Sequence, residues 1–79
     1  MPRYHFHLLD DVDAPDEDGR EFPDLDAAIA YAADNIRFTM AETVKAEGRV
    51  VLRHRIDIED SEGTVLASVP FGDVVKIEE

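Results

Sequence analysis

Apolar and polar residues alternate strictly over residues 3–9 (RYHFHLL). Neighbouring side chains of an extended strand point to opposite faces of a sheet, so this alternation predicts a strand with one apolar face. The apolar face carries two aromatic rings and a leucine, and the opposite face carries His5 and His7. We expect the apolar face to contribute to the core.

The strand pattern ends at residues 10–19 (DDVDAPDEDG), where proline, glycine and six carboxylates predict a solvated loop. A calcium site in this loop would need oxygen ligands at fixed positions. Aligning Gly19 with the glycine of the helix-loop-helix calcium motif puts Ala14 at the first ligand position, which favours a loop without calcium. Asp16 or Asp18 is expected to close an Asx turn before Gly19.

The apolar spacing changes to three or four residues in the central part of the chain, which is typical of one face of a helix. Asp24 is a good N-cap because its carboxylate can accept from the free backbone N–H groups of a first turn. Lys45 and Gly48 are signals for a helix end. The pattern predicts a helix over residues 24–47, about 35 Å long.

Strict alternation returns over residues 50–59, which predicts a second long strand. The DSEG segment that follows predicts a hairpin turn, because its glycine can adopt a positive φ. Residues 64–71 then form the return strand, in which Pro70 cannot donate a backbone hydrogen bond and indicates an edge or a bulge. Shorter strands are predicted over residues 20–22 and 74–77.

One long helix and three or four strands, each with one apolar face, predict a two-layer α+β fold in a single domain over residues 1–79. The helix is expected to pack across an antiparallel or mixed sheet. We expect the other sheet face to carry His5, His7, Arg53, Arg55 and Asp57, and to be open unless dimerisation or a partner covers it. The candidate partner-binding face consists of His5, His7, Arg53 and Arg55.

Charge limits the partners that the chain can bind. Eight Lys and Arg against nineteen Asp and Glu give a formal net charge of −11, which opposes binding to nucleic-acid phosphates and anionic lipids. We therefore expect neither nucleic acid nor membrane as a partner. Residues 37–55 form a basic island with five bases and two acids, and such asymmetry can support self-association through opposite patches.

Cysteine is absent, which excludes disulfide scaffolds, zinc–thiolate sites and cysteine nucleophiles. No segment approaches the roughly 18 uninterrupted apolar residues of a membrane span. The first residues lack the basic and apolar regions of a secretory signal. The expected location is the cytoplasm.

His5 and His7 are the strongest candidates for metal binding, since they lie about 6.6 Å apart on one strand face. A third ligand on a neighbouring strand would complete a site. Polar residues on an outer strand face need no such function, so we favour a surface or hydrogen-bonding role and expect no cofactor. His54 falls on the apolar face and is expected to be a buried neutral histidine.

Arg53 and Arg55 can bind a phosphate or an acidic partner through paired guanidinium donors. We favour pairing with Glu, Asp or His residues on neighbouring strands of the same sheet, because opposite charges on adjacent strands stabilise a sheet. For catalysis, Ser61 and Ser68 lack a nucleophile elbow, and the four glycines sit at turns or caps rather than in a phosphate-binding loop. We do not expect an enzyme.

Four segments together resemble a family of short bacterial proteins of unknown function. They are the opening MPRYHFHL, the stretch DEDGREFPDLDAA, the hairpin RIDIEDSEGTVL and the ending VPFGDVVKIE. The family pattern has an MPRYxFH start, a DExGxExPDL stretch and a C-terminal hairpin that closes with a PF motif. The resemblance implies a small cytoplasmic domain without an assigned activity, so it supports the fold and leaves function open.

These patterns favour a non-enzymatic interaction module, expected to be a homodimer or to bind a protein partner. The binding surface would be the open sheet face or an unpaired edge near residues 3–9 or Pro70, where a further strand can add. The alternative is a small-ligand or metal-binding domain that uses His5 and His7.

Overall fold

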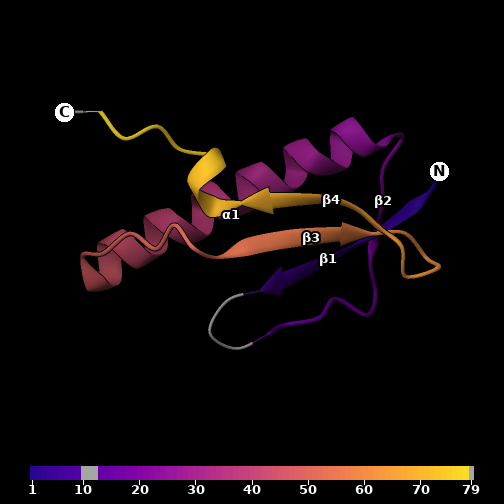
Figure 1. Cartoon of the computed structure of the whole chain (residues 1–79), viewed down its shortest axis with the longest axis horizontal. Coiled ribbons are helices and arrows are strands. Elements are labelled where there is room, and N and C mark those ends of the chain that lie inside the picture. Colours follow the sequence, from indigo (N-terminus) through magenta and orange to yellow (C-terminus); the bar gives the residue numbers. More distant parts are fainter. Residues whose placement is uncertain (10–12, 79) are drawn as a thin grey trace.

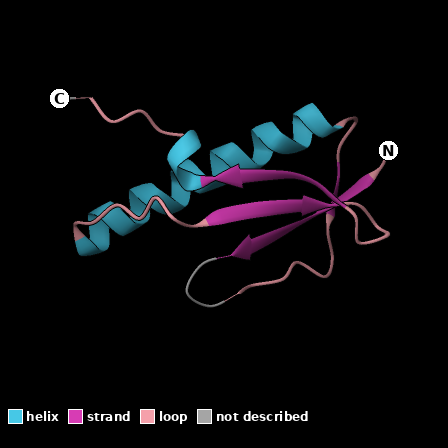
Figure 2. Ribbon diagram, viewed as in Figure 1, coloured by secondary structure: helices cyan, strands magenta, loops and turns pink. Residues whose placement is uncertain are grey.

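The computed structural model describes residues 1–9 and 13–78, within which the chain forms one α-helix, four strands and a 3₁₀ turn. In chain order these are β1 (Arg3–Leu9), β2 (Arg20–Glu21), α1 (Leu25–Glu47), β3 (Arg55–Glu59), β4 (Val65–Pro70) and η1 (Phe71–Asp73) (Figure 1). The helix lies on one face of the sheet, which confirms the predicted two-layer α+β fold (Figure 2). Part of the predicted acidic loop, residues 10–12, lies outside the described residues.

The sheet has the strand order β2-β1-β3-β4, and every strand pair in the described part of the chain is antiparallel. In this register His7 lies opposite Asp57, which in turn lies opposite Ser68. The strand order places β1 between two neighbours, β2 and β3. The expectation of an unpaired edge near residues 3–9 is wrong.

Helix α1 has the predicted caps. The Asp24 carboxylate accepts from the Ala27 N–H at 2.9 Å, and Gly48 has a φ of 69° with its N–H donating to the Val44 carbonyl. Both ends agree with the sequence because each cap satisfies backbone groups that a helix end leaves without partners. Within the described residues, no helix is long and apolar enough to cross a membrane.

The core lies between α1 and the helix-facing side of the sheet. Ile36 of the helix and Ile58 of β3 are fully buried. Small residues on the helix, Ala28 and Ala32, are also buried and let the helix approach the strands closely. The other buried residues are Tyr4, Met40, Ile56, Val69 and Phe71.

Strand β3 is shorter than predicted, because residues 50–54 form no strand and pairing begins at Arg55. Arg55 lies opposite Leu9, the last residue of β1, so the preceding residues have no strand on that side to pair with. The return strand likewise ends at Pro70, after which η1 begins. Residues 74–77, all of them described, form no strand either, so that prediction is wrong.

Residues 13–21, here called the covering segment, run back along the edge of β1 that faces away from β3. Ala14 and Leu8 exchange two backbone hydrogen bonds of 2.9 and 3.1 Å. Gly19 approaches β1 so closely that a Cβ atom there would lie 2.9 Å from both His5 Cε1 and the Tyr4 carbonyl oxygen. Its φ of +71° is also left-handed, so both conformation and space require glycine.

The first prediction separates these two requirements. Gly19→Ala should lower the free energy of unfolding more than Gly48→Ala, because Gly48 shares the positive φ but has nothing within 4 Å of an added Cβ. We expect the difference to be about 1–3 kcal/mol, the usual cost of forced overlap. Urea unfolding of both variants measures it. Equal losses would mean that the covering segment can move away from β1 without cost.

Candidate functional site

The outer face of the sheet, opposite α1, holds three of the four predicted binding residues. His5 and His7 on β1 lie opposite Glu59 and Asp57 on β3. Arg55 also lies on this face, opposite Leu9. Arg53 precedes β3, so the strand alternation that assigned it to the same face does not apply.

Both imidazoles bind the backbone of Asp16 in the covering segment. His5 Nδ1 donates to the Asp16 carbonyl oxygen at 3.1 Å, whereas His7 Nδ1 accepts from the Asp16 N–H at 3.0 Å. When both rings are neutral, His5 therefore carries its proton on Nδ1 and His7 on Nε2. The His7 Nε2 atom lies 3.4 Å from a carboxylate oxygen of Glu59.

The Asp16 carboxylate binds two further backbone groups. One oxygen accepts from the Phe6 N–H of β1 at 3.1 Å, and the other accepts from the Gly19 N–H at 3.0 Å. Burial raises the pKa of the Asp16 carboxyl, but the donors Gly19 and Phe6 favour the charged form and hold this pKa below its ordinary value. Asp16 thus closes the predicted turn before Gly19 and ties it to β1.

These bonds bear directly on metal binding by the histidine pair. The two rings are parallel within 10°, with centroids 6.4 Å apart, as expected for alternate residues of a strand. A metal on His7 Nε2 would require that nitrogen to lose its proton and would break the bond from Asp16. In the described part of the chain, no group of three or more His, Cys, Asp or Glu is arranged to hold a metal ion.

Charged and polar side chains on the outer face are largely bound to one another. Asp57 Oδ1 accepts from Arg55 Nε at 3.1 Å and from Ser68 Oγ at 2.7 Å. Arg55 therefore pairs with a carboxylate of its own strand and not, as the sequence suggested, with one on an adjacent strand. His54 is half-buried before β3, where its ring meets that of Phe71 edge-on.

A groove of about 330 Å³ lies beside the outer edge of β4. Its lining comes from α1, β4 and the residues after β4. Six of the lining residues are apolar, namely Ile29, Ala33, Ala67, Val69, Pro70 and Val74, and the other three are Arg37, Ser68 and Asp73. Residues 63–72, which include β4, carry no charged side chain. The sequence pointed to this edge through Pro70, but the helix residues of the groove depend on packing that a linear pattern does not contain.

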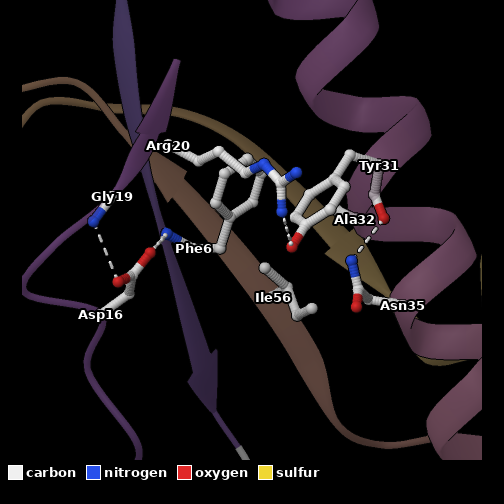
Figure 3. A pocket seen from close by; sticks show the side chains of 8 residues that line it. All are labelled: Phe6, Asp16, Gly19, Arg20, Tyr31, Ala32, Asn35 and Ile56. Atoms are coloured by element: carbon white, nitrogen blue, oxygen red, sulfur yellow. Dashed lines mark hydrogen bonds between the residues drawn. The ribbon is translucent and has the colours of Figure 1, made fainter. Parts of the chain in front are cut away.

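A second hollow, here called the Arg20 cavity, opens between α1 and β1 and has a volume of about 380 Å³ (Figure 3). Phe6, Ala32 and Ile56 supply its apolar lining. Arg20 reaches across from β2 and donates to the Tyr31 hydroxyl at 3.3 Å. Sequence reasoning did not identify this cavity, because its residues come from four separate segments.

The second prediction concerns Asp16→Asn. Asparagine replaces one of the two acceptor oxygens by an NH2 donor, which leaves either the Phe6 or the Gly19 N–H without its acceptor. We therefore expect a loss of about 1–3 kcal/mol in the free energy of unfolding at pH 7. Because the pKa of Asp16 is lower in the folded state, its contribution is complete above about pH 4 and is lost as pH falls through the folded-state value.

Urea unfolding of wild type and Asp16→Asn from pH 7 to pH 2 measures this effect, and the difference between them should shrink below about pH 4. Glu17→Gln removes the same charge from an exposed neighbouring side chain and serves as the control. A difference that stays constant with pH would show that the Asp16 carboxylate does not hold the covering segment.

Comparison with known proteins adds a family and no activity. The family model described as "Domain of unknown function (DUF6894)" matches residues 3–72. No curated protein and no solved structure matches the chain. The match spans most of the sequence, from the start of β1 into η1, and confirms the resemblance to a family of unknown function. The chain belongs to the DUF6894 family.

Proposed function

We propose that this protein is a non-enzymatic interaction module that associates by strand addition at the outer edge of β4, with a second copy of the chain as the partner. The observation that carries the proposal is the contrast between the two edges of the sheet. The covering segment pairs with the edge of β1, whereas among the described residues no strand pairs with the edge of β4 that faces away from β3.

The chemistry of β4 suits strand addition. Exposed edges of natural sheets are commonly protected by charged side chains, bulges or prolines that prevent pairing with another chain. β4 has Pro70 only at its end and no charge along its length. Its register shift against β3 lies near its start, between the pairs Val65–Glu59 and Ala67–Ile58. Its side chains Val65 and Leu66 are 51% and 40% exposed, so pairing would also remove apolar surface from water.

The groove beside β4 supplies the second element of this binding mode. An added strand gains affinity from main-chain hydrogen bonds and specificity from pockets for alternate side chains. Ile29 and Ala33 of α1 line the groove together with Ala67 and Val69 of β4. A strand placed against β4 would direct every second side chain toward this apolar lining.

Charge favours a second copy at this edge over contact through other surfaces. Each copy carries a net charge of −11, so two copies repel one another wherever their acidic surfaces meet. A two-fold axis across β4 would set the uncharged residues 63–72 against themselves in an antiparallel pair. Added salt should therefore strengthen the dimer by screening the remaining repulsion.

The third prediction tests the edge directly. Val65→Lys should abolish dimerisation, because it places a charge on each of the two paired strands. Val50→Lys is the matched control, since Val50 lies outside the sheet and is 48% exposed, close to the 51% of Val65. Sedimentation equilibrium and native mass spectrometry of the untagged proteins, at low and high salt, measure the outcome.

A dimer in wild type and Val50→Lys together with a monomer in Val65→Lys would support the proposal. A wild-type monomer at every protein and salt concentration would reject a second copy as the partner. Equal dimerisation of all three proteins would reject β4 as the contact.

A further inference from the structure

We propose that the Arg20 cavity binds a small organic acid, a single carboxylate on an apolar body, with the Arg20 guanidinium as its ion-pairing partner. This inference rests on the space between α1 and β1 and is independent of strand addition at β4. None of the residues that line this cavity lines the β4 groove.

The apolar part of the cavity is built by the way α1 sits on the sheet. The helix lies closest to β3 and β4, which leaves the inner face of β1 less covered. Aromatic rings bridge this gap, with Tyr31 lying 5.2 Å from Phe6 and 5.0 Å from Phe22 between ring centroids. Phe6 and Tyr31 also line the cavity, whose volume of about 380 Å³ falls in the lower range of small-molecule pockets and fits one ring or a short branched chain.

Arg20 supplies the charge that would recognise a ligand. Its guanidinium donates a 3.3 Å hydrogen bond to the Tyr31 hydroxyl and lies 5.0 Å from the centroid of that ring. No carboxylate forms an ion pair with Arg20 among the residues that the structure describes. A guanidinium has five N–H donors, so most of them remain available to an anion.

The acidic group in the cavity lining does not neutralise Arg20. Asp16 also lines the cavity, but its two carboxylate oxygens accept from the backbone N–H groups of Phe6 and Gly19. Figure 3 shows Asp16 turned toward Gly19 and β1, with Arg20 extending the other way, toward Tyr31. Arg20 therefore lies at a partly apolar cavity, and none of the acidic residues that the structure describes forms an ion pair with it.

The charge of the whole chain selects the ligand class. A net charge of −11 repels polyanions such as nucleotides, and one guanidinium cannot offset several phosphate charges. A monocarboxylate needs only one such partner, and its two oxygens match the parallel N–H donors of arginine. The side chains of Phe6, Ala32 and Ile56 suit the apolar body of such a ligand, a part that a small hydrated anion lacks.

The experiment is a titration of ¹⁵N-labelled protein with benzoate, followed by amide chemical shifts. We expect benzoate to shift the amides of Gly19, Arg20 and Asn35, which line the cavity. Benzamide, which has the same ring and no charge, should bind about tenfold more weakly, as expected for loss of a charge-assisted hydrogen bond. Hexanoate tests whether an aliphatic body serves as well as a ring.

Arg20→Gln should weaken benzoate binding by about tenfold or more. Lys76→Gln makes the same change in net charge outside the cavity and should bind as wild type does. The spectrum of each variant reports whether it is folded, so loss of binding is distinguishable from loss of structure. Val65→Lys changes the β4 edge and not the cavity, so it should bind benzoate as wild type does. Its titration therefore shows whether this proposal and the β4 proposal fail separately.

Three results would overturn the inference. The first is the absence of shifts at the cavity amides with benzoate and hexanoate up to about 10 mM, the range of very weak binding. The second is equal binding of benzamide and benzoate, which would remove the role of charge. The third is unchanged benzoate binding by folded Arg20→Gln.

Discussion

The structure depends on the way one carboxylate joins the covering segment to β1. Asp16 accepts from the Phe6 N–H of the strand and from the Gly19 N–H of its own turn, so a side chain fills the place of a backbone acceptor at the sheet edge. The backbone of Asp16 binds the imidazoles of His5 and His7 at the same time. Because a buried backbone N–H without a partner is costly, this single residue lets an acidic, proline-containing segment lie against the strand.

Because the covering segment lies along β1, the two edges of the sheet differ in charge and in strand pairing. The edge next to β1 carries the covering segment and its carboxylates, whereas the uncharged β4 forms the opposite edge. The histidines that looked most like ligands in the sequence are engaged in holding that segment. Their opposite tautomers follow from the two directions of hydrogen bonding to Asp16, so His5 and His7 are not equivalent even though they share one strand face.

The elements that the sequence predicted well are those defined by local chemistry. The caps of α1 follow from Asp24 and Gly48, and the alternation of β1 follows from side-chain pleating. Residues 50–54 alternate just as clearly but form no strand, because a strand needs a neighbour and β1 ends at Leu9, opposite Arg55. The short β2 was predictable from its turn, while its exact pairing depends on the contacts of Gly19 with β1.

The candidate sites were harder to predict because each is made by distant segments that meet around α1. Ala32 lines the Arg20 cavity and the adjacent Ala33 lines the β4 groove, so neighbouring small residues of one helix contribute to hollows toward opposite edges of the sheet. Small side chains let the helix approach the strands, and the same absence of bulk leaves space on each side of it. The Ala-rich helix thus explains both the tight core and the two hollows beside it, which a larger side chain at either position would fill.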